Sequence, residues 1–378
     1  MGSDNFANAA NSTNYNDNSA NAAFTCMPSD ICNTIVEYAV PIKLLNWINP
    51  DKIRWSFLSA NKAVGAFWLL EKNQDKIDWE WISRNSKAVG ILENNQDKII
   101  WEYLSKNPAA IPLLKKNQDK INWSQLSRNT KAMRLLEENQ DKIDWDWLSS
   151  NPAAMQLLEK NSNKINWHFL SSNPAAMKLL KLNPDKIDWI GLSLNQAAGA
   201  VLLLEENPDK IDWEWLSANP AVEAIRLLEE NPDKINWRWL SRNPAVKAIR
   251  LLEENPDKID WTILSLNPAV ETIRLLEKNP DKIDWLWLSL NPKAIRLLEK
   301  NQDKINWSWV SSNPAAIQLL EENQDKINWI WLSGNQSSKA MRILEKNPDK
   351  INWHGLFQNP AIFEKDLSGI KQIGKIFC

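Results

Sequence analysis

The chain has 378 residues, with 45 Lys and Arg against 47 Asp and Glu, so its net charge is −2. Its 23 Trp, 9 Gly and 2 His make the composition unusual. Scarce Gly argues against all-β folds and Gly-rich phosphate loops, and the balanced charge argues against nucleic acid as the main partner.

Cysteine usage and hydropathy favour an intracellular protein. Three Cys are too few for a disulfide framework. No apolar run approaches the roughly 18 residues of a membrane helix, and the N-terminus lacks the layout of a signal peptide. We therefore expect a cytoplasmic protein with no membrane partner.

Two N-terminal segments precede the main body of the chain. Residues 1–27 are rich in Asn and Ala, contain almost no core formers and are predicted to be a disordered tail. Residues 28–46 are predicted to form a capping helix, with Ser29 as its N-cap and Ile31 and Ile35 on one face.

One motif accounts for residues 47–360. The string NPDKIDWEWLSANPAVEAIRLLEEN around Trp213 recurs in fourteen units, each built on an anchor Trp that lies 22 or 24 residues from the next. The first anchor is Trp55 and the last is Trp353. Ile lies two residues before every anchor and Asn lies six residues after it, so the chain is a tandem repeat protein.

Each unit is predicted to form two helices. Asp212 is a good N-cap for a first helix that ends near Asn219, and Ile211 and Leu216 occupy the positions of a hydrophobic staple. A second helix follows and runs to Glu230. Helices this short are unstable alone and must stack, so the fold class is an all-α solenoid, a curved rod or superhelix about 110–140 Å long.

Residues 361–378 are predicted to cap the last unit. Ile362, Phe363, Leu367, Ile370 and Phe377 give this segment an apolar face. Such caps keep the ends of solenoids soluble.

The anchor tryptophans are interpreted as a structural core ladder, since a packing residue must recur in every unit and a binding residue need not. The alternative is a platform on which bases, sugars or Pro-rich peptides stack. The predicted core set is Trp79, Trp101, Trp123, Trp145, Trp167, Trp189, Trp213, Trp237, Trp261, Trp285, Trp307 and Trp329.

The recurring polar residues have structural interpretations with open alternatives. The Asn pair of each unit, such as Asn207 and Asn219, should end or cap helices, or else form a ladder that binds peptide backbone. Lys210 and its equivalents should form a solvated face. Arg226 and its equivalents should pair with helical Glu residues, with phosphate binding as the alternative.

Functional information is expected where the units differ. The residues one and five positions after each anchor share one face of the first helix and are mostly polar. A second aromatic, two positions after the anchor, is predicted to form a half-buried flank. Where the variable positions turn apolar they are candidates for partner binding, unless curvature or a cap buries them: Ile190, Leu194, Leu266, Leu286, Leu290 and Ile330.

The sequence gives no sign of catalysis. His168 and His354 occupy the same variable position in distant units, no Cys/His cluster has zinc spacing, and no phosphate-loop motif occurs. We expect no catalytic, cofactor-binding or metal-binding residues, no cofactor and no enzyme activity.

The run N-[PQ]-D-K-I-[DN]-W-x-x-L-S-x-N-P-x-A-I-x-L-L-E-x-N resembles a Trp- and Asn-rich helical repeat family of large DNA viruses of amoebae and algae. The resemblance covers about residues 44–363 and implies a viral α-helical repeat protein. Met27-Pro28-Ser29-Asp30-Ile31 and the residues after it are similar to the opening helix of F-box motifs, which implies a link to ubiquitin ligase machinery.

Three functions follow as hypotheses. The first is a non-catalytic scaffold that binds a protein partner, directed at the host. The second is a structural component of the virus particle, and the third is an F-box-like substrate adaptor. The expected location is the cytoplasm of an infected cell or the virion, with no nucleic-acid partner.

Overall fold

The computed structural model describes residues 42–365. It has two units: Leu44–Phe363, here called the repeat array, and a small unit to which residues 42–43 and 364–365 belong. The predicted tail over residues 1–27, most of the predicted helix over 28–46, and residues 366–378 of the predicted C-terminal cap lie outside the described residues.

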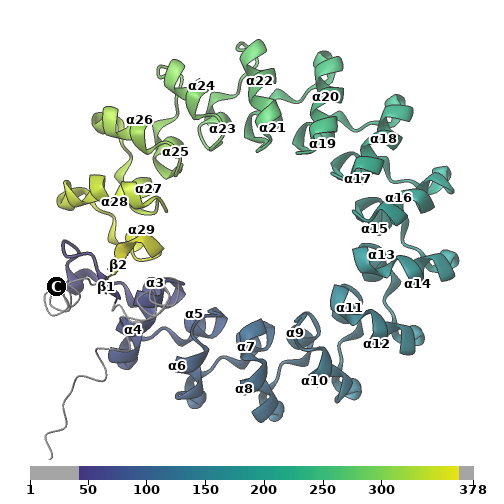
Figure 1. Cartoon of the computed structure of the whole chain (residues 1–378), viewed down its shortest axis with the longest axis horizontal. Coiled ribbons are helices and arrows are strands. Elements are labelled where there is room, and N and C mark those ends of the chain that lie inside the picture. The colour runs from purple at the N-terminus through teal and green to yellow at the C-terminus, as the bar shows by residue number, and fades with distance from the viewer. Residues whose placement is uncertain (1–41, 366–378) are drawn as a thin grey trace, which may run out of the picture. The chain divides into compact units, whose positions relative to one another are not determined.

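Within the repeat array, helices that begin at the anchor Trp residues form an inner layer, on the inside of the curve (Figure 1). Most of them make their main contacts with the inner helices of the repeats before and after them. The fourteen inner helices are α3 (Trp55–Ala60), α5 (Trp79–Arg84), α7 (Trp101–Lys106), α9 (Trp123–Ser127), α11 (Trp145–Ser149), α13 (Trp167–Ser171), α15 (Trp189–Leu194), α17 (Trp213–Ala218), α19 (Trp237–Arg242), α21 (Trp261–Leu266), α23 (Trp285–Leu288), α25 (Trp307–Ser312), α27 (Trp329–Ser333) and α29 (Trp353–Leu356).

The second helix of each repeat lies in an outer layer (Figure 1). The last described repeat has a 3-10 turn, Pro360–Ile362, in its place. The outer helices are α4 (Val64–Lys72), α6 (Val89–Glu93), α8 (Ile111–Lys116), α10 (Met133–Glu137), α12 (Met155–Lys160), α14 (Met177–Leu182), α16 (Ala198–Glu205), α18 (Val222–Glu230), α20 (Val246–Glu254), α22 (Val270–Lys278), α24 (Ile295–Lys300), α26 (Ile317–Glu322) and α28 (Ser338–Glu345).

The all-α solenoid of fourteen short repeats is therefore confirmed. Strand content among the described residues is limited to β1 (Ile42–Leu44) and β2 (Phe363–Lys365), which pair in a two-stranded sheet. The helix predicted over 28–46 is wrong in its described part, because residues 42–44 form β1. Pro41 precedes this strand, and a Pro breaks a helix at that point.

The first helix of each repeat forms as its local sequence predicts. Asp212 lies in extended backbone, and its carboxylate accepts a hydrogen bond from the Trp215 backbone N–H at 3.1 Å. Ile211 and Leu216, the predicted staple pair, are both buried. The helix ends at Ala218, as expected from Asn219.

The second helix depends on repeat length. In a 24-residue repeat α18 begins at Val222, two residues later than Pro220 suggests, because Asn219 first closes a turn onto the Ala221 backbone N–H. In a 22-residue repeat such as that of Trp145, a 3-10 turn over Pro152–Ala154 leads into a shorter helix, α12. Repeat length thus sets the length of the outer helix.

The fully buried core consists of aliphatic rows rather than Trp. In the repeat of Trp213, Leu216 from the inner helix and Ala224 and Leu228 from the outer helix are fully shielded from solvent. Ile211 packs beside them. Burying each Leu contributes about 1.5–3 kcal/mol, so the two layers are held together by these rows.

Neighbouring repeats are locked by a buried side-chain amide. The Asn219 Nδ2 donates to the backbone carbonyls of Ser193 and Asn195, both at 3.0 Å, and these groups close the C-terminal end of the preceding inner helix. The Asn219 side chain is 1% exposed. The equivalent Asn of each of the thirteen later repeats donates to one or two carbonyls of the repeat before it.

A serine hydroxyl forms a second bridge. Ser217 Oγ donates to the Trp213 carbonyl at 2.7 Å and accepts from the Asn236 backbone N–H of the next repeat at 2.9 Å. Thirteen Ser residues make the same link to the following repeat. The described residues contain no buried side-chain nitrogen or oxygen without a partner, so the recurring Ser and Asn are structural.

The repeat array closes on itself. Asn61 of the first repeat donates to the carbonyls of Phe357 and Asn359 of the last repeat, at 3.0 and 3.1 Å. The Leu45 backbone N–H donates to the Ile362 carbonyl at 2.9 Å. At this seam Phe357 stands where other repeats have Ser; it is buried and stacks on an anchor Trp.

The expectation of a curved rod or superhelix about 110–140 Å long did not include this closure. Small Ser and Asn side chains let the inner helices approach closely, whereas Leu, Ile and Ala separate the outer helices, and interaxial distance follows side-chain size. Each repeat is therefore rotated relative to the one before it, and thirteen such rotations bring the fourteenth repeat beside the first.

Replacing Asn219 by Ala should lower the free energy of unfolding by about 2–3 kcal/mol, because two buried carbonyls lose their donor. The control is Asn231→Ala: this half-buried amide donates to a single carbonyl, that of Leu227, and its loss should cost about 1 kcal/mol. Urea unfolding measures both, and equal losses would contradict the proposed bridge.

Closure is tested by cross-linking. In a chain whose three Cys are replaced by Ser, Phe57→Cys with His354→Cys should form a cross-link within one chain with a short bis-maleimide, because the native rings lie 5.7 Å apart. Phe57→Cys with Trp215→Cys is the control. Cross-linking of the first pair only between copies, with a rate that rises with protein concentration, would rule out closure.

Candidate interaction surface

The surface of the inner layer is built from three positions in each repeat. The residues three and four positions after an anchor Trp are buried, as Leu216 and Ser217 are, whereas those one, two and five positions after it reach the surface. Together these variable positions form what we call the inner-helix face. It contains the places where the repeats differ.

The six predicted partner residues lie in this layer, but not in one patch. Ile190 and Leu194 are exposed on α15, three repeats before the exposed Leu266 on α21. Leu286 on α23 is 44% exposed and Ile330 on α27 is 64% exposed. Leu290 is half-buried and lies beyond the end of α23, so its expected exposure is wrong.

The aromatic residues two positions after the anchors lie beside these residues, and some of them contact each other between neighbouring repeats as tilted pairs. Trp215 and Trp239 lie 5.3 Å apart between ring centroids, and Trp309 and Trp331 have the same spacing. Most of these rings are half-buried, as predicted, but Trp81, Trp287 and Trp331 are exposed. The sequence pattern alone does not distinguish these three as surface groups.

The inner-helix face differs in charge along the array. From α5 to α11 it carries both acidic and basic groups, and the Arg84–Glu80 ion pair, at 2.8 Å, is an example. From α19 to α27 its charged residues are only Arg238 and Arg242, and the rest are apolar, aromatic, Ser, Thr or Gly. The apolar groups therefore concentrate in one part of the face.

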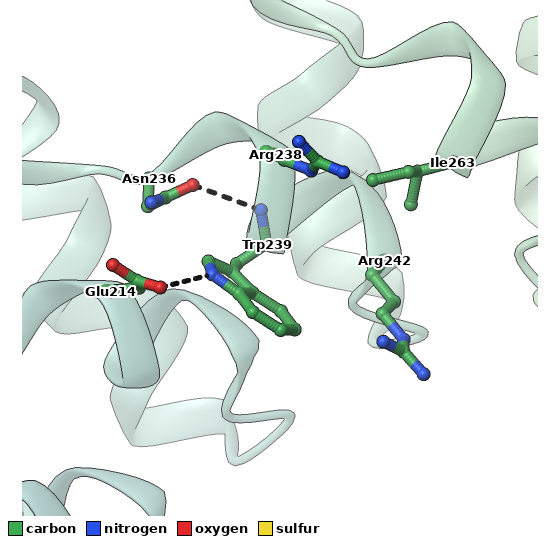
Figure 2. Close-up of a pocket in the computed structure, with 6 residues that line it drawn as sticks. All are labelled: Glu214, Asn236, Arg238, Trp239, Arg242 and Ile263. Carbon is green, nitrogen blue, oxygen red and sulfur yellow. Dashed lines mark hydrogen bonds between the residues drawn. The ribbon is translucent and has the colours of Figure 1, made fainter.

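A groove marks the start of this apolar part (Figure 2). One section, about 350 Å³, lies between α17 and α21, and an adjoining section, about 660 Å³, reaches α23. Arg238, Arg242 and Ile263 line both sections. The second section is also lined by Pro244, Thr262, Leu266, Asn267, Pro268 and Trp287.

Hydrogen bonds fix the aromatic wall of the groove. The Trp239 indole N–H donates to Glu214 Oε1 at 2.8 Å, and the Trp239 backbone N–H donates to Asn236 Oδ1 at 3.2 Å (Figure 2). The Arg242 guanidinium lies 5.9 Å from the centre of the Trp239 ring. The ring is thus held in place before any ligand arrives.

The anchor tryptophans serve as packing residues. Each of the twelve predicted core Trp residues is half-buried and packs against the core. The exposed side of Trp145 is covered by Lys164 of the next repeat, whose Nζ is 4.7 Å from the ring centre. Nine Lys residues cover anchors in this way, at 4.7–5.1 Å.

For these nine residues the interpretation of the recurring Lys as a solvated face is wrong, because a Lys over an indole gains about 0.5–1 kcal/mol and shields apolar surface. Lys210, Lys234, Lys258 and Lys282 are instead exposed and lie 3.3–3.9 Å from the preceding Asp, as predicted. The signal in the sequence is that Lys and Trp recur in the same register.

The other recurring residues lie as follows. Asn207 donates to the Leu203 carbonyl and ends its helix, as predicted. The alternative of an Asn ladder that binds a foreign peptide is wrong for Asn219 and its equivalents, whose amides bind the array's own backbone. Arg226 pairs with Glu230 one helical turn away, as predicted, and with Glu205 of the preceding repeat.

The two His residues are surface groups: His168 contacts Asp188 at 3.0 Å and His354 packs edge-on against Phe57 at the seam. Between residues 42 and 365 no three His, Cys, Asp or Glu side chains are grouped so as to hold a metal ion. Within the same range no helix is long and apolar enough to cross a membrane.

The outer layer carries a second row of exposed apolar residues that the sequence interpretation missed. Val222, Val246 and Val270 begin three successive outer helices and are exposed. The available signal was the Asn-Pro-Ala-Val string of the 24-residue repeats.

Comparisons of the chain with protein-family models, with curated proteins and with solved structures gave no match.

The division between anchor and surface aromatic is testable. Trp237→Ala should lower the free energy of unfolding by about 2–4 kcal/mol, because it leaves a cavity beside the core. Trp331→Ala, at an exposed ring, should cost less than about 1 kcal/mol. Urea unfolding of both variants measures the difference, and the reverse order would show that the anchors are not the packing residues.

Proposed function

We propose that the protein is a non-catalytic scaffold that binds a protein partner through the apolar part of its inner-helix face. The observation that carries the proposal is the concentration of exposed Leu266, Leu286, Trp287, Ile330 and Trp331 on three inner helices, of which two, α21 and α23, share the groove. Exposed apolar surface shared by neighbouring helices, as on α21 and α23, is typical of protein interaction sites.

The buried polar network supports a non-catalytic role. Every recurring Ser hydroxyl, such as that of Ser217, is already bonded to two backbone groups, and the recurring buried Asn amides bridge repeats. A nucleophile needs an adjacent base and a free hydroxyl. The surface that varies between repeats offers shape and apolar contact instead.

The inner layer is a better docking surface than the valine row of the outer layer. The inner-helix face combines aromatic rings, aliphatic side chains and a groove, whereas the outer row offers one short side chain per repeat. Aromatic residues supply most of the binding energy at protein interfaces.

The resemblance to repeat proteins of large DNA viruses supports a role directed at the host, in the cytoplasm of an infected cell or in the virion. The alternative prediction is that the protein is a structural component of the virus particle. The F-box-like adaptor hypothesis depends on residues outside the described part of the chain.

Proximity labelling in infected cells tests the proposal. Leu286→Asp with Ile330→Asp should reduce labelling of the main partner about tenfold, because each charge would be desolvated in an apolar contact. The matched control is Leu182→Asp with Val270→Asp, which places the same charges on exposed positions of the outer layer. Loss of labelling by the control but not by the first variant would move the binding site to the outer layer and overturn the proposal.

A further inference from the structure

We propose that the groove between α17 and α23 binds a short segment of the partner protein that carries carboxylates at one end and apolar side chains at the other. This inference rests on the proposed function and names the chemistry that the groove selects. The evidence is the distribution of charge and apolar surface along the groove.

The positive part of the groove is formed by one helix. Arg238 and Arg242 are four residues apart on α19, so they lie on the same side of that helix, and both line the two sections of the groove. Both are exposed. Two neighbouring guanidinium groups favour a carboxylate, which accepts paired hydrogen bonds from them.

Two acidic groups face these arginines, and neither neutralises both. Asp260 Oδ2 is 4.0 Å from Arg238 Nε, at the limit of an ion pair, and Glu214 is bonded to the Trp239 indole on the α17 side. The Arg242 guanidinium contacts the face of the Trp239 ring. Positive charge is therefore available toward α21 and α23.

The opposite end of the groove is apolar. Ile263 and Leu266 on α21 and Trp287 on α23 line it, together with Pro268. Two helix spacings of 8–10 Å separate α19 from α23, about 16–20 Å in all. An extended chain covers that distance with about five or six residues, which is the length of a linear peptide motif.

Nucleic acid fits this surface less well, although Arg and Trp together also suit phosphates and bases. Affinity for nucleic acid depends on several neutralised phosphates. From α19 to α27 the inner-helix face offers only the two arginines, and Glu214 and Asp260 flank them. A protein segment with one or two carboxylates matches this charge better.

The experiment requires no identified partner, because ligands are selected from a random library. Displayed peptides about twelve residues long, enough to span the groove twice, are selected on the full chain. We expect enrichment of sequences with Asp or Glu followed by apolar and aromatic residues. A fluorescent copy of the best peptide is then titrated against variants whose melting temperature matches that of the unaltered chain.

Arg238→Glu with Arg242→Glu should weaken this peptide about tenfold or more, since charge reversal repels the carboxylates. Arg84→Glu with Arg128→Glu makes the same change of charge at the positions equivalent to Arg242 in two other repeats and should leave the affinity within about twofold. Replacing the peptide's acidic residues by Gln should weaken binding to the unaltered chain, but not to the Arg238→Glu, Arg242→Glu variant.

The outcomes separate the two proposals. Selected peptides that are weakened by Leu286→Asp with Ile330→Asp but not by the arginine changes would overturn the present inference and leave the proposed function standing. Selection of no peptide that depends on the inner-helix face would overturn both. Tighter binding of a single-stranded oligonucleotide than of any peptide, lost on the arginine changes, would replace the protein segment by nucleic acid.

Discussion

The structure depends on one buried amide per repeat. The last carbonyl groups of a helix have no partner within it. Here the Asn of the next repeat supplies one: Asn243 donates to the carbonyls of Ser217 and Asn219, and Asn219 does the same for the repeat before. Each repeat therefore completes the inner helix of its predecessor, which explains why helices of four to six residues are stable only in the array.

The same constraint explains closure. In a row of such bonds, the Asn of the first repeat has no preceding repeat to bind. In this array that residue, Asn61, donates to backbone carbonyls of the last repeat instead. The seam is not a copy of the other interfaces, because Phe357 fills the Ser position and Arg54 replaces the usual Asp or Asn cap. The first and last repeats are also joined at the seam by an edge-on contact between the Phe57 and His354 rings. The seam residues are thus specialised in the sequence.

The repeats are held together through backbone carbonyls and buried aliphatic rows. The side chains of the inner-helix face are therefore not needed to hold the array together, and they can differ between repeats. This is why α5 to α11 can carry mixed charges while α21 to α27 carry mainly Leu, Ile and Trp on the same scaffold. The variable positions were identifiable from the sequence by their departure from the repeat. Their grouping into a groove with Arg238 and Arg242 was not, since that requires three helices in register.

The sequence by itself determined the number of repeats, the helix pairs, the Asp and Asn caps and the boundaries that Asn207 and its equivalents set, because these depend on residues within a few positions of one another. Only the tertiary structure decided which carbonyls the Asn amides bind, that Lys side chains lie over anchor Trp rings, and that the first repeat contacts the last. These contacts join residues about 20 or more positions apart, and they follow from the rotation between repeats, which no single position of the motif specifies.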